Sequence, residues 1–423
     1  MWQVMEAFVV FLRTARAIAL LGASGAVGGE PVFLVLGEDL TPREVSADGA
    51  VVTGHASFGF GSGGAFRWTE EGIEILEPPP GSFNIVTDPF GLSADGRVIV
   101  GIHNAGPGPE AFRWTEETGM VLLGDFPGGP FESRATATSG DGAVVVGFGS
   151  TDTSEDHEAF RWTLASQQFE GLGFLDADTG VFSVAEDVTP DGDVVVGRSR
   201  SRQGQEAFRW TRETGMVGLG SLPSPFFRSS ARAVSADGSV VVGWAFGEEG
   251  QEAFRWTAET GMVELGDLPG PPFQSVAHDV SGDGSIVVGE GGAADTDDAF
   301  IWTEAHGMRR LSEALEQDYG LDLGGWTLAV AWAISLDGRT IVGSAYPAEG
   351  GEDQAFIVYL GDPPCPADLD GDGAVGLLDL NTLLLNFGRI AGAQPEQGDL
   401  DRDGDIDVAD LAALLSAFGG ACG

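Results

Sequence analysis

Two aspartate-rich runs near the C-terminus have the spacing of calcium-binding loops. The second run repeats the first 31 residues later, and each run places glycine, Gly373 or Gly404, at its sixth position. Oxygen ligands at alternate positions wrap one Ca²⁺, glycine allows the sharp bend, and the seventh residue offers its carbonyl. The sequence therefore predicts two bound Ca²⁺ ions. Their predicted ligands are Asp368, Asp370, Asp372, Ala374 and Asp379 in the first loop, and Asp399, Asp401, Asp403, Asp405, Asp407 and Asp410 in the second.

Each run is followed by an apolar stripe at helical spacing, with no helical pattern in front of it. The stripes, LLDLNTLLLNFG and VADLAALLSAFG, argue against the alternative of a solvated acidic linker. A duplicated calcium loop and following helix resembles a type I dockerin over residues 362–423, a small all-α domain. The resemblance implies binding to a cohesin module through Leu377, Leu378, Val408 and Ala409. Many dockerins carry Ser or Thr at these positions, so another surface receptor remains an alternative partner.

Cys365 and Cys422 bracket this domain and are the two cysteines of the chain. In an exported chain, cysteines so placed are expected to form a disulfide that joins the ends of the module. Residues 1–29 contain two arginines and then apolar and small residues, which is typical of a signal peptide, with a plain disordered leader as the alternative. Together with a calcium module suited to millimolar external calcium, these features predict a secreted, extracellular protein, free or anchored at the cell surface.

The composition excludes several classes of function. The 423 residues carry 65 acidic and 21 basic side chains, a formal net charge of −44, and 43% of them are hydrophobic. A surface this negative repels nucleic acid and anionic lipid, while the hydrophobic content is enough for a core and excludes global disorder. Outside the first 28 residues no run of 18 apolar residues exists, so we expect no membrane span in the mature chain.

Internal repetition predicts the fold of the remaining chain. The string AFRWT and its variant AFIWT recur every 46 to 48 residues, a seventh copy reads AFIVY, and an Asp-Gly pair precedes each of the seven copies. Each unit reads as four short strands rich in Val, Phe, Trp and Thr, separated by Gly, Asp or Pro. Four strands in about 46 residues favour a β-propeller. The Asp-Gly pairs begin at Asp48, Asp95, Asp141, Asp191, Asp237, Asp283 and Asp337.

The two ends of the repeat region predict how the ring closes. The seventh unit stops after its third strand, whereas a stretch resembling a fourth strand, PVFLVLGEDL at residues 31–40, stands alone before the first unit. Joining the two completes an all-β, seven-bladed β-propeller over residues 30–361. The insertion LSEALEQDYGLDLGG before the last unit predicts one short helix. The repeated strings resemble those of the HAF family of bacterial extracellular repeat proteins, which implies export and a repeat scaffold but no catalytic residues.

Two repeated features have a structural and a functional interpretation. The arginines of AFRWT either face a ligand or pair between blades, and we favour pairing because Ile301 and Ile357 replace arginine without disturbing the repeat. The Asp-Gly pairs lack the spacing of the sialidase Asp box, so we expect type I′ hairpin turns. The arginines concerned are Arg67, Arg113, Arg161, Arg209 and Arg255.

Ligand binding is expected where the repeats disagree. Three residues before the Ser or Thr of each Asp-Gly turn, on the strand nearest the axis, the side chain differs in every unit but two. Aromatic residues in the preceding loops are expected to share one rim, where they bind a sugar or peptide or simply fill the rim. The predicted ligand-binding residues are Arg43, Phe90, Glu186, Arg232, His278 and Trp332, with Phe131, Phe227 and Phe273 from the loops.

Catalytic chemistry is not evident in these residues. The sequence has no known nucleophile, zinc or phosphate-binding motif. Glu186 with Asp187, or His278 with Asp279, offers an acid and a base, but neighbours on a strand are expected to face opposite sides. We therefore expect a monomeric, non-catalytic propeller that binds a glycan or protein. The alternative is a polysaccharide-active enzyme, a glycoside hydrolase or lyase, carried by the dockerin-like domain.

Overall fold

The structure is a computed structural model, and it divides the chain into two compact units. The first unit includes Phe33–Tyr359 and the second includes Leu360–Gly423. The predicted leader, Cys365, Cys422 and Phe273 lie outside the described residues. Those described are 31–59, 62–80, 82, 86–104, 108–126, 130–151, 157–176, 178, 182–269, 274–292, 298–348, 350–361, 367, 369, 375–389, 397–398, 400 and 405–418.

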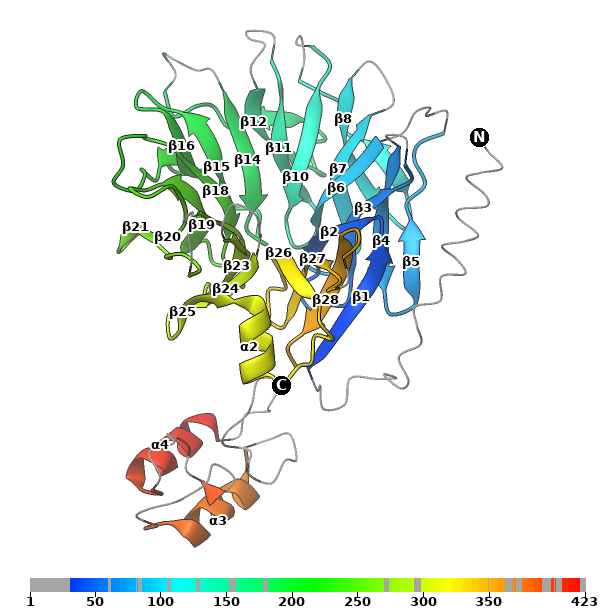
Figure 1. The fold of residues 1–423 in the computed structure, drawn as a ribbon. Coiled ribbons are helices and arrows are strands. Elements are labelled where there is room, and N and C mark those ends of the chain that lie inside the picture. Colours follow the sequence, from blue (N-terminus) through cyan, green and yellow to red (C-terminus); the bar gives the residue numbers. More distant parts are fainter. Residues whose placement is uncertain are drawn as a thin grey trace. The chain divides into compact units, whose positions relative to one another are not determined.

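The first unit is built of four-stranded meanders, as the repeat predicts (Figure 1). Five sheets of the described chain have four strands, and a sixth has eight because a single parallel pair, Gly63 with Val86, joins two meanders. The first strands are β2 Leu40–Val45, β6 Val86–Leu92, β10 Ser133–Thr138, β14 Ser183–Val188, β18 Ser229–Val234, β22 Ser275–Val280 and β26 Thr327–Ile334. The second strands are β3 Val52–Ser57, β7 Val98–Asn104, β11 Val144–Ser150, β15 Val194–Arg200, β19 Val240–Phe246, β23 Ile286–Gly291 and β27 Thr340–Tyr346.

The outer strands follow the same order along the chain. The third strands are β4 Gly63–Thr69, β8 Pro109–Thr115, β12 His157–Thr163, β16 Gln205–Thr211, β20 Gln251–Thr257, β24 Asp298–Thr303 and β28 Gln354–Tyr359. The fourth strands are β5 Gly72–Ile75, β9 Gly119–Leu122, β13 Phe169–Gly171, β17 Gly215–Gly218, β21 Gly261–Glu264 and β25 Gly307–Arg310, with β1 Val32–Glu38 in the last meander. Strand β1 pairs with β28, so the predicted completion of the last unit by the N-terminal strand is confirmed.

The Asp-Gly turns differ from the predicted type I′ form. Only the glycine has positive φ, between 67° and 76° in the seven turns, and none of the seven aspartates does. The Ser46 hydroxyl donates to Asp48 and accepts the N–H of Val51 at 2.9 Å, which widens the loop to four residues. Since a type I′ turn needs positive φ at both central residues, that prediction is wrong. The serine or threonine before each pair decides the turn.

Neighbouring meanders pack through the repeated phenylalanine. Phe208 is fully buried, and the equivalent residue of every other AFRWT copy is equally buried. Phe208 lies among Val146 and Ala159 of the preceding meander, and Phe66 lies among Ala333 and other residues of the last meander. The first meander is therefore packed against the last as well as against the second. At about 25 cal/mol per Å² of buried apolar surface, these contacts dominate the stability of the unit.

Backbone hydrogen bonds between successive turns link the meanders at one end. Ala47 N–H donates to Ala94 O at 3.0 Å, the same bond recurs from turn to turn, and Asp337 N–H donates to Ala47 O at 3.3 Å. The series is interrupted where Pro190, which has no N–H, would donate. A Cβ on Gly49 would collide with Thr340 of the last meander, which is why glycine is needed at this close approach.

One helix interrupts the repeat, as expected. Helix α2, Leu311–Asp318, precedes the last meander and buries Leu311, Ala314 and Leu315. It contacts β24 and β25 of the sixth meander and, to a smaller extent, β26 of the last. Among the described residues, no helix is both long and apolar enough to span a membrane.

The described part of the second unit contains two helices of equal length. Helix α3, Leu377–Asn386, and helix α4, Val408–Ala417, each follow one of the aspartate-rich runs. Leu383 and Leu414 are fully buried together with Val375 and Ile406, the residues at the eighth position of each run. The internal duplication read from the sequence is thus repeated in the packing.

Candidate functional site

The variable position of each meander is a β-bulge. In β14 the register shifts between Ala185 and Asp187, which leaves Glu186 as the extra residue, and the same shift recurs in all seven first strands. A bulge re-aims the side chain and breaks the alternation of a strand. The extra residues are Arg43, Phe90, Thr136, Glu186, Arg232, His278 and Trp332.

These seven residues line one cavity of about 730 Å³. Since each comes from a different first strand, and each first strand contacts the next, with β2 contacting β26, the cavity lies along the axis of the ring. The structure thus brings together Arg43, Phe90, Glu186, Arg232, His278 and Trp332, residues up to 289 positions apart in sequence (332 minus 43). We call this space the axial cavity.

The three loop phenylalanines are not part of its wall. Phe131 is 39% exposed and Phe227 is half-buried, and neither lines the axial cavity. Two other aromatic residues, Phe148 and Trp244, line it instead. Each directly follows the glycine that recurs in every second strand. The position after this glycine also varies between repeats, and the sequence did not lead us to predict it as part of the site. That position reads His55, Ile102, Phe148, Arg198, Trp244, Glu290 and Ser344.

Ion pairs and ring contacts order the cavity wall. Glu186 pairs with Arg198 and, at 3.8 Å, with Arg232. His278 lies 4.8 Å from the ring of Trp332 and 3.4 Å from a carboxylate oxygen of Glu290. Burial alone would raise the pKa of Glu290, but the hydrogen bond and charge of His278 outweigh it and the pKa is lowered.

Carboxyl groups next to the bulges also face the cavity. Glu186 and Asp187 both line it, as do His278 and Asp279, so the expectation that strand neighbours face opposite sides is wrong here. The bulge removes the two-residue period that the expectation assumed. Asp187 accepts the N–H of Val234 at 2.9 Å, which joins two first strands.

The pKa values of these carboxyl groups are displaced upward. Burial raises the pKa of Asp187 to about 6, and burial with the charge of Asp187 raises the pKa of Asp279 to about 8. Burial and the charges of Asp279 and Asp187 raise the pKa of Glu44 well above its usual value. At neutral pH Asp279 is therefore largely protonated and can donate as well as accept a hydrogen bond, whereas Asp187 is largely ionised.

The arginines of AFRWT lie elsewhere, between meanders. Arg113 Nε donates to Gly142 O of the next Asp-Gly turn at 3.0 Å, and Arg67, Arg161 and Arg209 make the equivalent bond. Pairing between units, the favoured interpretation, is confirmed for these four. Arg255 Nε is buried without a hydrogen-bond partner among the described residues, beside a cavity of about 440 Å³ next to α2.

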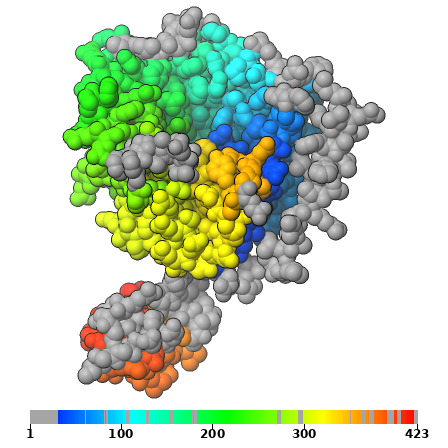
Figure 2. All heavy atoms as spheres, viewed as in Figure 1, coloured from blue at the N-terminus to red at the C-terminus, as the bar shows by residue number. Residues whose placement is uncertain are grey.

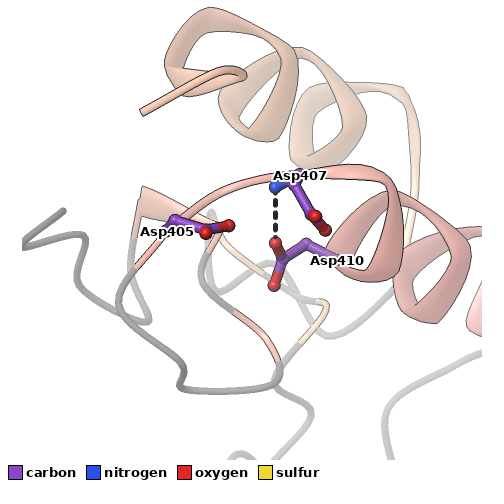
Figure 3. Close-up of side chains that lie close together, drawn as sticks. All are labelled: Asp405, Asp407 and Asp410. Atoms are coloured by element: carbon purple, nitrogen blue, oxygen red, sulfur yellow. Dashed lines mark hydrogen bonds between the residues drawn. The ribbon is translucent and has the colours of Figure 1, made fainter. Parts of the chain in front are cut away.

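In the second unit, the end of the second aspartate run forms a carboxylate cluster (Figure 3). Oxygen atoms of Asp405, Asp407 and Asp410 lie within 4.8 Å of one another. Asp410 is fully buried and accepts N–H groups from Leu400 at 2.6 Å and Asp407 at 2.8 Å. Asp379 makes the matching bonds to the N–H groups of Leu369 and Gly376 in the first run.

The remaining predicted calcium ligands, Asp368, Asp370, Asp372, Ala374, Asp399, Asp401 and Asp403, lie outside the described residues. The predicted partner-binding residues, Leu377, Leu378, Val408 and Ala409, are all exposed on the first turns of α3 and α4. Leu377 is 75% and Val408 68% exposed, which is unusual for large apolar side chains.

Comparison with known proteins gives the fold. No family model and no curated protein matches the chain. Among solved structures, oligogalacturonate lyase from Vibrio parahaemolyticus has 12% identity and a TM-score of 0.50, with 80% of this chain and 99% of that chain covered. The four-stranded meanders of the described residues are consistent with this structural similarity. The first unit has a β-propeller-like fold. An all-β propeller-like domain followed by helices is thus the part of the predicted architecture that the structure supports.

Two further similar structures are more distant. The beta-propeller domain of the Trilobed protease from Pyrococcus furiosus has 12% identity and a TM-score of 0.48, with coverage of 75% of this chain and 94% of that chain. TolB from Acinetobacter baumannii has 16% identity and a TM-score of 0.41, and the match covers 64% of this chain and 62% of the TolB chain. Identities this low establish similarity of fold only.

Proposed function

We propose that the chain is a secreted, non-catalytic binding protein whose first unit is a closed, seven-bladed propeller of HAF-type repeats. It binds its ligand in the axial cavity. The observation that carries this proposal is the coincidence of two independent features, because the residue that varies between repeats is also the bulged residue that lines the cavity. Positions fixed by packing repeat, so a varied position on a cavity wall is free to be specialised for a ligand.

Several contacts support closure with seven blades. The hydrogen bond from Asp337 to Ala47, the packing of Phe66 on the last meander and the pairing of β1 with β28 all join the ends of the repeat region. Closure packs the first blade against the last, so that neither has a sheet face without a neighbouring blade.

We further propose that the second unit is a dockerin-like module that holds two Ca²⁺ ions and anchors the protein to a cohesin or another surface receptor. The donors are all oxygen, the class that Ca²⁺ prefers. Asp405, Asp407 and Asp410 already converge, and like charges at this separation favour a counter-ion. The exposed apolar residues of α3 and α4 supply the docking surface. Export is supported by the leader sequence and by the cysteines, which are expected to pair.

One observation favours the alternative of a polysaccharide-active enzyme. Glu186, Asp187 and Asp279 face the same cavity, and the raised pKa values of Asp187 and Asp279 suit a general acid or base near neutral pH. The same carboxyl groups accept backbone N–H bonds from Val234 and Ile334, however, which is a structural role. We therefore retain binding as the main proposal.

A glycan array probed with the full chain tests the ligand-binding proposal. Replacing His278 and Trp332, which stack at 4.8 Å, with Ala should weaken binding of any glycan retained, while Phe131→Ala, outside the cavity, should not. Unchanged affinity in a folded H278A/W332A protein would remove the axial cavity from consideration. Release of shortened products from a bound glycan would instead establish the enzyme.

Calorimetric titration of the chelator-treated full chain with Ca²⁺ tests the module. We expect two ions per chain in the native protein and one after Asp370→Ala or Asp401→Ala, which each remove a ligand from one loop. Asp353→Ala, at an exposed site of the first unit, is the control and should leave two. Absence of binding at millimolar Ca²⁺ would contradict the proposed calcium sites.

A further inference from the structure

The axial cavity opens asymmetrically. Beyond the bulged residues, its wall extends toward the rim opposite the Asp-Gly turns only in the third, fourth and fifth meanders. The residues there are Arg134, Phe148, Arg198, Gln205, Arg228 and Trp244. In the other four meanders the matching second-strand positions, His55, Ile102, Glu290 and Ser344, do not line the cavity. We call the six residues the arginine mouth.

Positive charge exceeds negative charge in the arginine mouth. Arg134 pairs with Glu132 at 3.2 Å, and Glu186 is shared by Arg198 and Arg232. Arg228 forms no ion pair with any residue that the structure describes. The three arginines of the mouth and the adjacent Arg232 thus outnumber the neighbouring carboxylates Glu132, Glu186 and Glu290, in a chain whose formal net charge is −44. Because physiological salt screens charges beyond about 8 Å, this local excess decides what binds in the mouth.

Unused hydrogen-bond donors point the same way. The Nε atoms of Arg134 and Arg232 are buried and have no partner among the described residues. A buried donor without an acceptor is unfavourable, so a ligand that brings acceptors is favoured there. Burial and the neighbouring charges of Arg232 and Arg228 lower the pKa of Arg198 to about 10, which leaves it cationic at neutral pH.

Two of these guanidinium groups lie over aromatic rings. Arg228 lies over Trp244 at 5.3 Å and Arg134 lies over Phe148 at 5.6 Å. A planar guanidinium fixed on a ring is preorganised for two-point binding of a carboxylate. Ring faces next to charged groups also suit the C–H face of a sugar, and about 730 Å³ is within the usual range for small ligands.

An extended peptide fits the cavity less well. Binding of a peptide strand relies on free N–H and C=O groups at a strand edge. Here Asp187 accepts the N–H of Val234, Asp279 accepts the N–H of Ile334 at 2.8 Å, and Thr136 donates to Ala185 O at 2.9 Å. Side chains therefore already use main-chain groups at the free edges of the first strands.

From these observations we propose that the ligand of the axial cavity is an acidic oligosaccharide, with uronate carboxylates bound by the arginine mouth. This inference rests on the proposed binding function and specifies its ligand class. Arg228 and Arg232 are the most direct ligand-binding residues, since Arg228 has no ion pair within the described chain and Arg232 has an unused buried donor. Each carboxylate contact to a charged donor is expected to change affinity about tenfold or more.

Calorimetry with the full chain tests this inference. The probes are short oligomers of galacturonate, glucuronate and mannuronate, each compared with its fully methyl-esterified form, which keeps the sugar but removes the charge. At least one acid should bind more than tenfold more tightly than its ester, and binding should weaken as salt increases. Arg228→Gln and Arg232→Gln should each weaken it about tenfold. Arg97→Gln, 83% exposed at an Asp-Gly turn, is the matched control and should leave it unchanged.

The outcomes separate this inference from the binding function on which it rests. Equal binding of acid and ester, unaffected by Arg228→Gln, would overturn the acidic-ligand inference while leaving a glycan-binding cavity. Tighter binding of a polyglutamate peptide than of any uronate would overturn the choice of sugar. If the array and all probes show no binding, both proposals fail. Arg228 is exposed, so Arg228→Gln is expected to fold. Its result therefore tests the inference even if Arg232→Gln does not fold.

Discussion

The walls between meanders and the wall of the axial cavity are built from the same strands but use the sequence repeat in opposite ways. Between meanders, Phe208 and its equivalents are fully buried in every copy, and Arg113 and three equivalents make one repeated hydrogen bond. Along the axis, the bulged residue differs in every meander except two, in which it is Arg43 or Arg232. Repetition therefore marks packing that each unit must reproduce, and departure from it marks the positions free for a ligand.

Removing strand β1 is expected to have the largest effect on the packing between meanders. Deletion of residues 32–38 should lower the melting temperature by about 10 °C or more, because Leu34 and Leu36 pack on the core shared by the first and last meanders. The control is V217D/V263D, on outer strands where these side chains are 49% and 47% exposed. Equal melting temperatures for the deletion and the control would contradict closure by β1.

Denaturant unfolding of two phenylalanine variants compares the packing between meanders with the wall of the axial cavity. Phe208→Ala leaves a hole between two meanders and should cost about 3–5 kcal/mol of unfolding free energy. Phe148→Ala, on the cavity wall, should cost about 1 kcal/mol or less, because the cavity already adjoins it. A similar loss in both variants would show that the cavity wall is as constrained as the packing between meanders.

Aspartates of the two regions should respond to pH with opposite sign. Asp279, on the cavity wall, has a pKa raised to about 8, so its contribution to stability is full below pH 4 and is lost as pH rises toward 8. Asp141, in an Asp-Gly turn, accepts the N–H of Ala143 and the Ser139 hydroxyl, which lower its pKa. Its contribution is present above pH 4 and is lost as pH falls.

Urea midpoints across pH measure this difference. Asp279→Asn, which cannot ionise, should match the native protein below pH 4 and be more stable at pH 9. Asp141→Asn should be less stable at pH 7, with the difference shrinking as pH falls below 4. Both variants keep an acceptor oxygen, so the comparison isolates charge. Stability differences that do not vary with pH would contradict the opposite displacement of the two pKa values.

Much of the fold could be predicted because its causes are local. The alternation in AFRWT places Phe on the buried face, the insertion before the last unit forms α2, and the stray strand β1 completes the last meander. The pairing of arginines between units was predicted from two substitutions, Ile301 and Ile357. The type of the Asp-Gly turns was not predicted correctly, because the Ser46 hydroxyl widens the loop beyond what the Asp-Gly pair alone indicates.

The candidate site was predicted only in part. The variable first-strand position was identified correctly as a wall of the axial opening, but the second variable position, occupied by Phe148, Arg198 and Trp244, was overlooked although the preceding glycine repeats. Phe131 and Phe227 were chosen as aromatic residues of a shared rim, and the structure leaves them outside the cavity.

By itself, the sequence determined the repeat, the order of strands and the variable residue of each first strand, since these depend on periodicity and on neighbours along the chain. Only the tertiary structure decided which of those residues meet. The bulge at Glu186 turns both it and Asp187 toward the axis, against the two-residue period of a strand. Contact between the first and last meanders places Arg43 over Trp332 at 5.2 Å, and packing of three consecutive meanders gathers the arginine mouth. Such contacts depend on long-range packing, to which no local pattern in the sequence corresponds.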